Sequence, residues 1–139
     1  MFYGWAGTNL EIDLSRGTIN KEAIEPKLFE AYLGAKGTNA WILWDRVSPE
    51  VDAFSPDNPL IIGAGVLTGT MVPSANRTTI TYKSPVTDIH SYSVVGGYFA
   101  AKLKFAGYDT IILSGKSPTP CYLWIDDDRV ELREAGHLW

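Results

Sequence analysis

The sequence predicts an α+β fold: one mostly antiparallel sheet with hairpin connections and two helical regions. Short strand patterns repeatedly occur in pairs separated by a turn, which is typical of antiparallel pairing. Helical periodicity is confined to residues 26–47 and 97–105, too little for the regular strand–helix alternation of a doubly wound sheet. The 139 residues are 45% hydrophobic. We therefore expect residues 1–139 to form a single domain with its own core.

A β-hairpin is expected at the start of the chain. Apolar and polar residues alternate over residues 8–14, the period of a half-buried strand. A turn containing Gly17 follows, and residues 18–22 return as the partner strand.

Two helices are expected next. Pro26 suits the first turn of a helix, because proline lacks an N–H that would be unpaired there anyway. Gly34 and Gly37 interrupt the pattern, and a second helix should occupy about residues 38–47. The apolar residues assigned to the faces of these helices are Leu28, Phe29, Tyr32 and Leu33, then Ala40, Trp41, Leu43, Trp44 and Val47.

The rest of the chain alternates strands with connections. Residues 48–59 are rich in proline and predict a surface connection, and residues 63–73 predict a glycine-rich loop. Residues 97–105 predict a helix that Gly107 caps. The remaining strands are expected over residues 60–62, 78–83, 91–95, 110–113, 121–125 and 129–132, the last two forming a hairpin around Asp126-Asp127-Asp128.

Composition excludes several classes of protein. The formal net charge is −4 and no basic run is present, so nucleic-acid binding is not expected. No apolar run is long enough to span a membrane, and residues 1–5 lack the features of a signal peptide. The single Cys121 rules out an internal disulfide and an all-cysteine metal site. A cytoplasmic location fits these features. The C-terminal Trp139 either docks on the domain or marks a chain that stops inside a longer sequence.

Two glycine-containing segments could approach an anion. In the loop 63–73, glycines allow close contact with a ligand, and Arg77 just beyond it can pair with a phosphate. The alternative is a tight loop with Arg77 in a surface ion pair. Gly96-Gly97 precede a helix pattern, where unpaired N–H groups and the helix dipole favour an anion. The alternative is a structural turn, and neither a dinucleotide fingerprint nor a P-loop is present.

The other chemically interesting residues have simpler interpretations. Lys36, between two glycines, could meet a phosphate or a ring carbonyl, but an ordinary interhelical turn is the default interpretation of this segment. His90 and His137 lack a defined partner, and the aspartates at the hairpin tip indicate a solvated turn rather than a cation site. No nucleophile has an activating context, so no catalytic residue and no metal ligand is assigned.

The order of these segments resembles the N-terminal domain of the tungsten-containing aldehyde:ferredoxin oxidoreductase family. Each motif is common, whereas the ordered set is specific and covers essentially the whole chain. The matching segments are Gly4-Trp5, Leu33-Gly34-Ala35-Lys36-Gly37, Ser55-Pro56-Asp57-Asn58, Gly65-Val66-Leu67-Thr68-Gly69-Thr70, Arg77, Lys83-Ser84-Pro85, Gly96-Gly97-Tyr98-Phe99, Leu103-Lys104-Phe105-Ala106-Gly107-Tyr108-Asp109 and Gly115-Lys116.

The resemblance implies an α+β domain that forms the base for a tungsten-bis-pterin cofactor. It implies that Arg77 and the Gly96-Gly97 backbone contact the pterin phosphates. The other residues assigned to the cofactor are Val95, Ser93, Asn76 and Lys36. The expected partners are the C-terminal domains or a companion subunit of the same enzyme, ferredoxin or another electron carrier, and a second copy in a homodimer.

Two departures from the family pattern matter. Aldehyde oxidoreductases of the family often carry an asparagine before the glycine pair, associated with a magnesium ion between the pterin phosphates; here Val94 and Val95 stand there. Segments around Gly37, Asn76 and Ser93 look closer to the active-site subunit of class II benzoyl-coenzyme A reductase.

Family members are also several times longer, and their [4Fe–4S] cysteines and further pterin motifs lie in later domains. This chain should therefore be the cofactor-binding part of an anaerobic oxidoreductase that oxidises aldehydes with ferredoxin as electron acceptor, inactive alone. The alternatives are a cofactor-free interaction or scaffold module, a split subunit of a benzoyl-coenzyme A reductase-like complex, and a stand-alone nucleotide binder.

Overall fold

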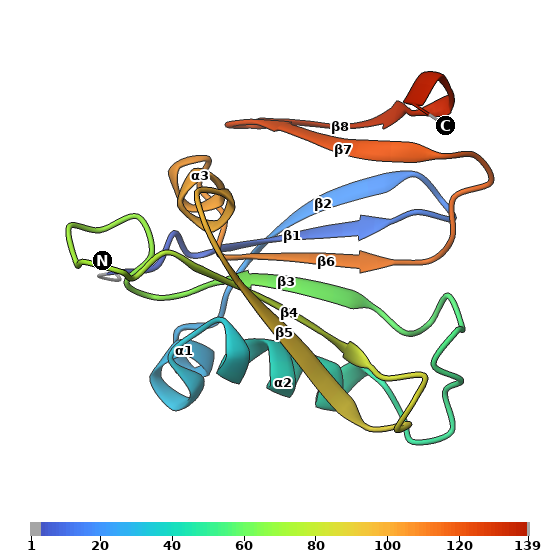
Figure 1. Ribbon diagram of the computed structural model, residues 1–139, viewed down its shortest axis with the longest axis horizontal. Helices are drawn as coiled ribbons and strands as arrows, with labels where there is room; N and C mark the ends of the chain where they lie inside the picture. Colours follow the sequence, from blue (N-terminus) through green and yellow to red (C-terminus); the bar gives the residue numbers. More distant parts are fainter. Residues whose placement is uncertain (1–3, 139) are drawn as a thin grey trace.

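The computed structural model describes residues 4–138, which form eight strands, three α-helices and a short 3-10 helix (Figure 1). The elements are, in chain order, β1 Thr8–Asp13, β2 Thr18–Ala23, α1 Pro26–Tyr32, α2 Lys36–Arg46, β3 Leu60–Ala64, β4 Arg77–Lys83, β5 His90–Gly96, α3 Phe99–Phe105, β6 Thr110–Ser114, β7 Cys121–Asp126, β8 Arg129–Glu134 and η1 Gly136–Leu138. The α+β prediction is confirmed, and every expected strand is present within about two residues of its expected bounds. The expectations for Trp139 and for residues 1–3 lie outside the described residues.

Six strands form one sheet in the order β2-β1-β6-β3-β4-β5, and β7 and β8 form a separate hairpin. Every neighbouring pair is antiparallel except β1 and β6, which run parallel with Leu10 opposite Ile111. The sheet therefore joins an N-terminal hairpin, β1–β2, to a meander, β3–β4–β5, through a strand from much later in the chain.

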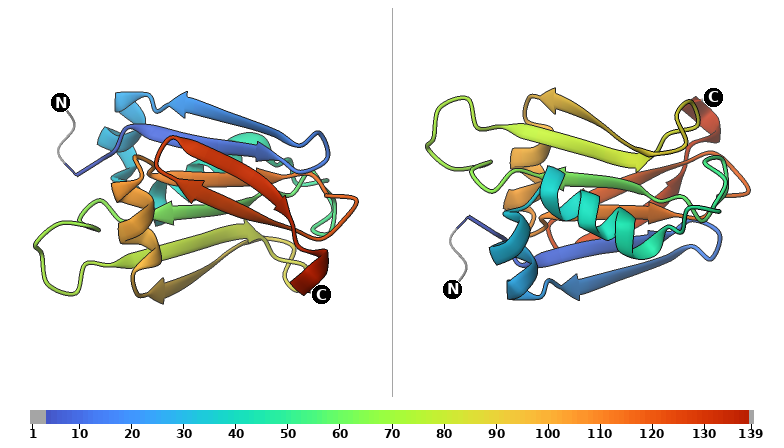
Figure 2. Two further views of the ribbon diagram at one scale, coloured as in Figure 1. Left: turned by 90° about the horizontal axis from the view of Figure 1, so that it is seen from above. Right: turned by 90° about the horizontal axis from the view of Figure 1, so that it is seen from below.

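Both faces of the sheet are covered, by different elements. Helices α1 and α2 lie on one face, here called the helix side; α3 and the β7–β8 hairpin lie on the other, the hairpin side (Figures 1 and 2). The buried cluster on the hairpin side comprises Leu10, Ile12, Ala64, Ala100, Leu103, Tyr108 and Ile111. The smaller cluster on the helix side comprises Ile42, Leu43, Ile61 and Ile112. Alternation along each strand divides its residues between these two cores.

The buried face of α2 differs from the expected one. Trp44, placed on the apolar face of the helix by its spacing, is 85% exposed, whereas Asn39 is fully buried. The Asn39 amide nitrogen donates to the Ile61 carbonyl (3.3 Å), to the Thr79 carbonyl (3.2 Å) and to the Thr81 hydroxyl (3.4 Å). An asparagine thus attaches the helix to two central strands, which periodicity of apolar residues alone does not reveal.

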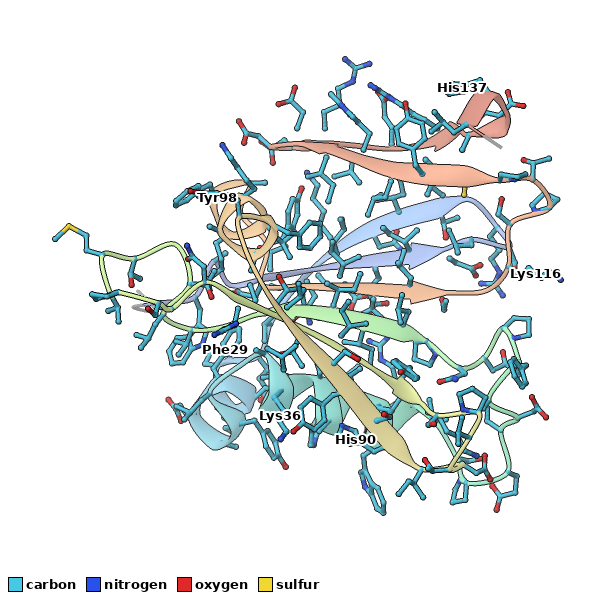
Figure 3. The ribbon with its side chains drawn as sticks, in the orientation of Figure 1. Phe29, Lys36, His90, Tyr98, Lys116 and His137 are labelled. Carbon is cyan, nitrogen blue, oxygen red and sulfur yellow. The ribbon has the colours of Figure 1, made fainter. Side chains whose placement is uncertain are left out.

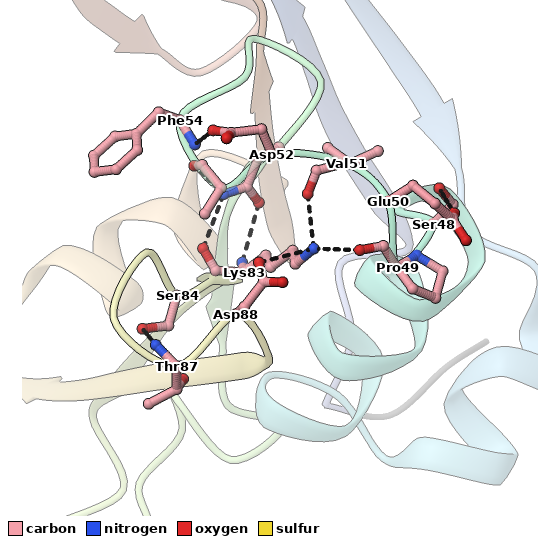
Figure 4. Close-up of polar contacts among 12 residues, drawn as sticks. Ser48, Pro49, Glu50, Val51, Asp52, Phe54, Lys83, Ser84, Thr87 and Asp88 are labelled. Atoms are coloured by element: carbon pink, nitrogen blue, oxygen red, sulfur yellow. Dashed lines mark hydrogen bonds and ion pairs between the residues drawn. The ribbon is translucent and has the colours of Figure 1, made fainter.

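A buried lysine fixes the long connection between α2 and β3, which the sequence correctly predicted as a loop. Lys83, at the end of β4, donates from Nζ to the carbonyls of Pro49 (2.7 Å) and Val51 (2.7 Å) and pairs with Asp88 at 3.0 Å (Figure 4). Asn58 also bonds the backbone of Lys83, accepting from its N–H (3.0 Å) and donating to its carbonyl (2.9 Å). This end of the sheet is therefore held by polar contacts.

The tip of the β7–β8 hairpin is an exposed turn, as expected, and it also contacts the main sheet. The Asp128 carbonyl and carboxylate accept from Lys21 Nζ at 2.7 and 3.2 Å. The Asp127 carbonyl accepts from the Tyr108 hydroxyl at 3.0 Å. The aspartate tip thus anchors the hairpin to the main sheet. None of the helices within residues 4–138 is long and apolar enough to cross a lipid bilayer.

Candidate functional site

Arg77 and Gly96 meet at one end of the sheet. They are direct partners in the antiparallel ladder between β4 and β5. A Cβ atom added to Gly96 would lie 3.2 Å from Arg77 Nη1, so the guanidinium group lies across the glycine. Gly97 follows with φ +111°, and no atom lies within 4 Å of the place that a Cβ would take there, which leaves space for a ligand. We call Arg77, Gly96 and Gly97 the anion site.

The anion site lies at the end of a strand rather than at the start of a helix. Gly96 is the last residue of β5, and α3 begins only at Phe99, after an N-cap Tyr98 that makes no side-chain capping bond. The positive charge at the site therefore comes from the Arg77 guanidinium, which can hold a phosphate through two parallel N–H donors.

Contacts of the backbone hold Arg77 in place. Its carbonyl accepts from the Gly65 N–H at 3.2 Å, and its N–H donates to the Thr68 hydroxyl at 3.4 Å. Thr68 is only 2% exposed, and its hydroxyl donates to the Ala75 carbonyl at 2.9 Å. The loop between β3 and β4 therefore fixes the backbone of Arg77, although Arg77 as a whole is exposed to solvent.

Lys36 shares a face with Arg77 but lies farther along the strand. Its Nζ stands 3.8 Å from the centre of the Tyr92 ring, a cation–π contact. Figure 3 shows Lys36 and His90 on the helix side and Tyr98 near α3 on the hairpin side. Tyr92 precedes Gly96 by four residues, about 13 Å at about 3.3 Å per residue. Lys36 is thus a neighbour of the anion site rather than a member of it.

The other sequence-predicted residues are placed differently. Ser93 and Val95 alternate with Tyr92 and Gly96, so their side chains point to the hairpin side of β5, away from Lys36. Asn76 precedes Arg77, but its side-chain oxygen accepts from the Gly69 N–H at 3.3 Å. The structure therefore brings together Arg77, Gly96 and Gly97, with Asn76 supporting the adjacent loop.

The segments next to the anion site carry exposed apolar residues, and this feature was missed. Met71 is 99% exposed and Tyr98 is 80% exposed. With the other exposed residues on the loop, on β5 and on α3 they form what we call the apolar rim: Leu67, Met71, Val72, Val95, Tyr98, Phe99 and Phe105. Large apolar side chains inside a glycine-rich loop were the signal available in the sequence.

The described residues contain no alternative metal centre. No group of three or more His, Cys, Asp or Glu that could hold a metal ion occurs within residues 4–138. Cys121, at the start of β7, is partly buried.

Comparison with known proteins identifies the family. The family model described as "Aldehyde ferredoxin oxidoreductase, N-terminal domain" matches residues 9–139. The tungsten-containing aldehyde ferredoxin oxidoreductase of Pyrococcus furiosus is 42% identical over 137 residues, 99% of this chain and 23% of that protein. The WOR-like subunit of the aliphatic sulfonate oxidoreductase from the same organism is 34% identical, over 99% of this chain and 22% of its own length.

A solved structure gives the same fold at higher identity. A chain of the "Active site complex BamBC of Benzoyl Coenzyme A reductase in complex with 1,5 Dienoyl-CoA" is 51% identical with a TM-score of 0.98. The match covers 99% of this chain and 21% of that one, so this chain spans less than a quarter of the length of these relatives. The chain belongs to the aldehyde ferredoxin oxidoreductase family and corresponds to its N-terminal domain.

Proposed function

We propose that this chain is the N-terminal base of a tungsten-bis-pterin oxidoreductase and that its anion site holds a pterin phosphate. The observation that carries the proposal is the Arg77 guanidinium lying across Gly96, next to the open Gly97. A side chain at Gly96 would occupy the place where a phosphate meets the guanidinium. The cofactor would supply two-electron redox chemistry at tungsten, while this chain supplies position and positive charge.

Arg77 rather than a metal ligand on β5 would neutralise the phosphate. Val94 and Val95 carry no ligating atom, and Ser93 points to the opposite face of the strand. The residues present therefore fit an anion, but β5 offers no side chain on this face for a bridging magnesium ion. In this proposal, any such ion takes its protein ligands from other parts of the enzyme.

The remaining parts of the enzyme would cover the apolar rim. Exposed apolar surface of this kind marks an interaction site, and the relatives are about four times longer than this chain. Those parts would also supply the cysteines for a [4Fe–4S] cluster and the contact with ferredoxin, because one cysteine cannot hold a cluster. An anaerobic, reducing cytoplasm is the compartment that suits this chemistry.

Titration with pyrophosphate tests the anion site directly. Calorimetry at low salt should show saturable binding, and Arg77→Met should weaken it by about ten- to a hundred-fold, the value of a charge-assisted hydrogen bond pair. Arg16→Met is the matched control, because Arg16 is 81% exposed and pairs with Asp13 at the other end of the sheet. Equal binding by wild type and Arg77→Met would refute the assignment.

Loading of the whole enzyme tests the cofactor. The chain co-expressed with the C-terminal part should yield an assembly that contains tungsten and pterin, measured by elemental and fluorescence analysis. A folded assembly free of both would contradict the proposal and favour the cofactor-free scaffold.

A second candidate is the corresponding part of a benzoyl-coenzyme A reductase-like complex acting on an aromatic acyl thioester. The observation in its favour is the 51% identity to a chain of that complex, against 42% to an aldehyde oxidoreductase. The assembled enzyme should be assayed with aldehydes and with aromatic acyl-coenzyme A thioesters under the same conditions. Activity with only one class decides between the two.

A further inference from the structure

A buried ion pair lies behind the anion site and has no role in the function proposed above. Lys104, on α3, pairs with Asp109, just before β6, and their side chains are only 8% and 3% exposed. Removing charges from water is costly, so a buried pair persists only where further hydrogen bonds satisfy both groups.

Those further hydrogen bonds go to the backbone near the start of the chain. Lys104 Nζ donates to the Gly4 carbonyl at 2.6 Å. The Asp109 carboxylate accepts from the N–H groups of Ala6 (3.1 Å) and Gly7 (2.6 Å). The pair thus holds residues 4–7, which we call the N-terminal strap.

The strap packs closely against the loop that carries Arg77. Gly4 has φ +83°, and a Cβ atom there would lie 2.9 Å from both the carbonyl oxygen and a methyl group of Val66. On its other side, Trp5 stacks on Phe29 at 4.7 Å and donates to the Leu33 carbonyl at 2.8 Å. The strap therefore sits between α1 and the start of the β3–β4 loop with little freedom to move.

The β3–β4 loop in turn holds the backbone of Arg77 through hydrogen bonds. Val66 lies between Gly65, which bonds the Arg77 carbonyl, and Thr68, whose hydroxyl accepts from the Arg77 N–H. Each step from Lys104 to Arg77 is a direct contact, so the coupling runs through a contiguous set of packed and hydrogen-bonded groups.

We propose that Lys104 and Asp109 are positioning residues for the anion site: they hold the strap, the strap sets the β3–β4 loop, and the loop sets Arg77 across Gly96. This inference rests on the proposed function of the anion site. A guanidinium that binds a ligand must be held within about 0.5 Å of its productive place. A pair that touches neither cofactor nor substrate can therefore still contribute to binding by holding that position.

Lys104→Met tests the inference against Lys83→Met as matched control. Both lysines are buried and both bond backbone carbonyls, but Lys83 lies at the opposite end of β4 from Arg77. Hydrogen exchange of residues 65–77 and pyrophosphate affinity are measured where each variant is folded by circular dichroism. We expect Lys104→Met to speed exchange at Gly65 and Thr68 at least ten-fold and to weaken pyrophosphate at least ten-fold. Lys83→Met should do neither.

Two further variants keep the test decisive. Lys104→Arg should restore affinity and protection towards wild type, because arginine keeps the buried charge. If Lys104→Met does not fold, Gly4→Ala perturbs the strap from the Val66 side and should give the same local pattern. Unchanged exchange over residues 65–77, or an equal effect of Lys83→Met, overturns the inference. If the wild type does not bind pyrophosphate, that result counts against the proposed function. The hydrogen-exchange data then still show whether Lys104 holds residues 65–77.

Discussion

Replacing Gly63 by alanine should destabilise the protein through a collision with Asn39. Gly63 is buried in β3, and an added Cβ would lie 2.5 Å from Asn39 Oδ1, 3.0 Å from its Nδ2 and 3.1 Å from the Ala35 Cα. A separation of 2.5 Å is not tolerated, so Asn39 or the first turn of α2 must move. Asn39 cannot move alone, because its amide nitrogen is held by three acceptors on β3 and β4.

The cost has two contributions. Forcing one methyl group into a packed interior costs about 1–3 kcal/mol. Displacing Asn39 weakens its hydrogen bonds to buried carbonyls, at about 1 kcal/mol each. We therefore expect Gly63→Ala to lower the free energy of unfolding by about 2–4 kcal/mol, a large share of the stability of a domain this size.

A double-mutant cycle measured by urea denaturation isolates the collision. Asn39→Ala alone should cost about 2–3 kcal/mol, because it leaves buried carbonyls without a donor and opens a cavity. In that background Gly63→Ala finds space, so its own cost should fall by at least about 1 kcal/mol. Gly136→Ala is the control, because the nearest atom to its added Cβ is the Glu134 carboxylate at 3.4 Å, an ordinary contact.

Two results would refute the reasoning. The first is a Gly63→Ala variant as stable as Gly136→Ala. The second is strict additivity of Gly63→Ala and Asn39→Ala, which would mean that the two positions do not touch.

Three other changes have clear expected outcomes. Lys83→Met should cost about 2–4 kcal/mol in urea unfolding and speed hydrogen exchange in residues 48–59, since the carbonyls of Pro49 and Val51 lose their donor; unchanged exchange there would contradict the anchoring role. Phe29→Ala should cost about 3–5 kcal/mol and alter tryptophan fluorescence, because Phe29 is 2% exposed and stacks on Trp5. Hydrogen bonds from Arg133, and to a smaller extent from Arg129, hold the pKa of Glu131 below its usual range. The charged Glu131 carboxylate therefore stabilises the fold above the ordinary glutamate pKa, and this stabilisation is lost as the pH falls through the lowered pKa. The stability difference between wild type and Glu131→Gln should therefore shrink on going from about pH 6 to about pH 3, and a difference that stays constant would count against this ion pair.

Local patterns predicted the elements well and their assembly poorly. The alternation in β1 and the turn at Gly17 identified the first hairpin, because neighbouring residues determine both. The parallel pairing of β1 with β6, Leu10 opposite Ile111, joins residues about a hundred positions apart. No local signal specifies it, since only the hydrophobic faces of the two strands select the partner.

The faces of the helices show the same limit. Trp44 fits an apolar stripe by spacing, but it lies on the outer side of α2, and Asn39 occupies the buried position. A buried asparagine needs hydrogen-bond partners. The acceptors of Asn39 lie on β3 and β4, so the sequence of the helix does not reveal them.

The candidate site was partly predictable. Arg77 and the glycine pair were identified separately, yet their meeting depends on the β4–β5 register, which pairs Arg77 with Gly96 across a long hairpin connection. The helix start was placed two residues too early, so the glycine pair lies at the end of β5 and the proposed anion site depends on the Arg77 guanidinium rather than on helix N–H groups. Ser93 and Val95 were grouped with Gly96 by proximity in sequence, whereas the period of two sends their side chains to the other face.

The strand order constrains how the chain can fold during synthesis. In the order β2-β1-β6-β3-β4-β5, the strand that joins the two halves of the sheet is the last of these six in the chain. Until residues 110–114 leave the ribosome, the β1–β2 hairpin and the β3–β4–β5 meander each expose an unpaired inner edge. Such edges invite pairing with other chains, and long-range closure slows folding. The nascent protein should therefore depend on chaperones until β6 inserts.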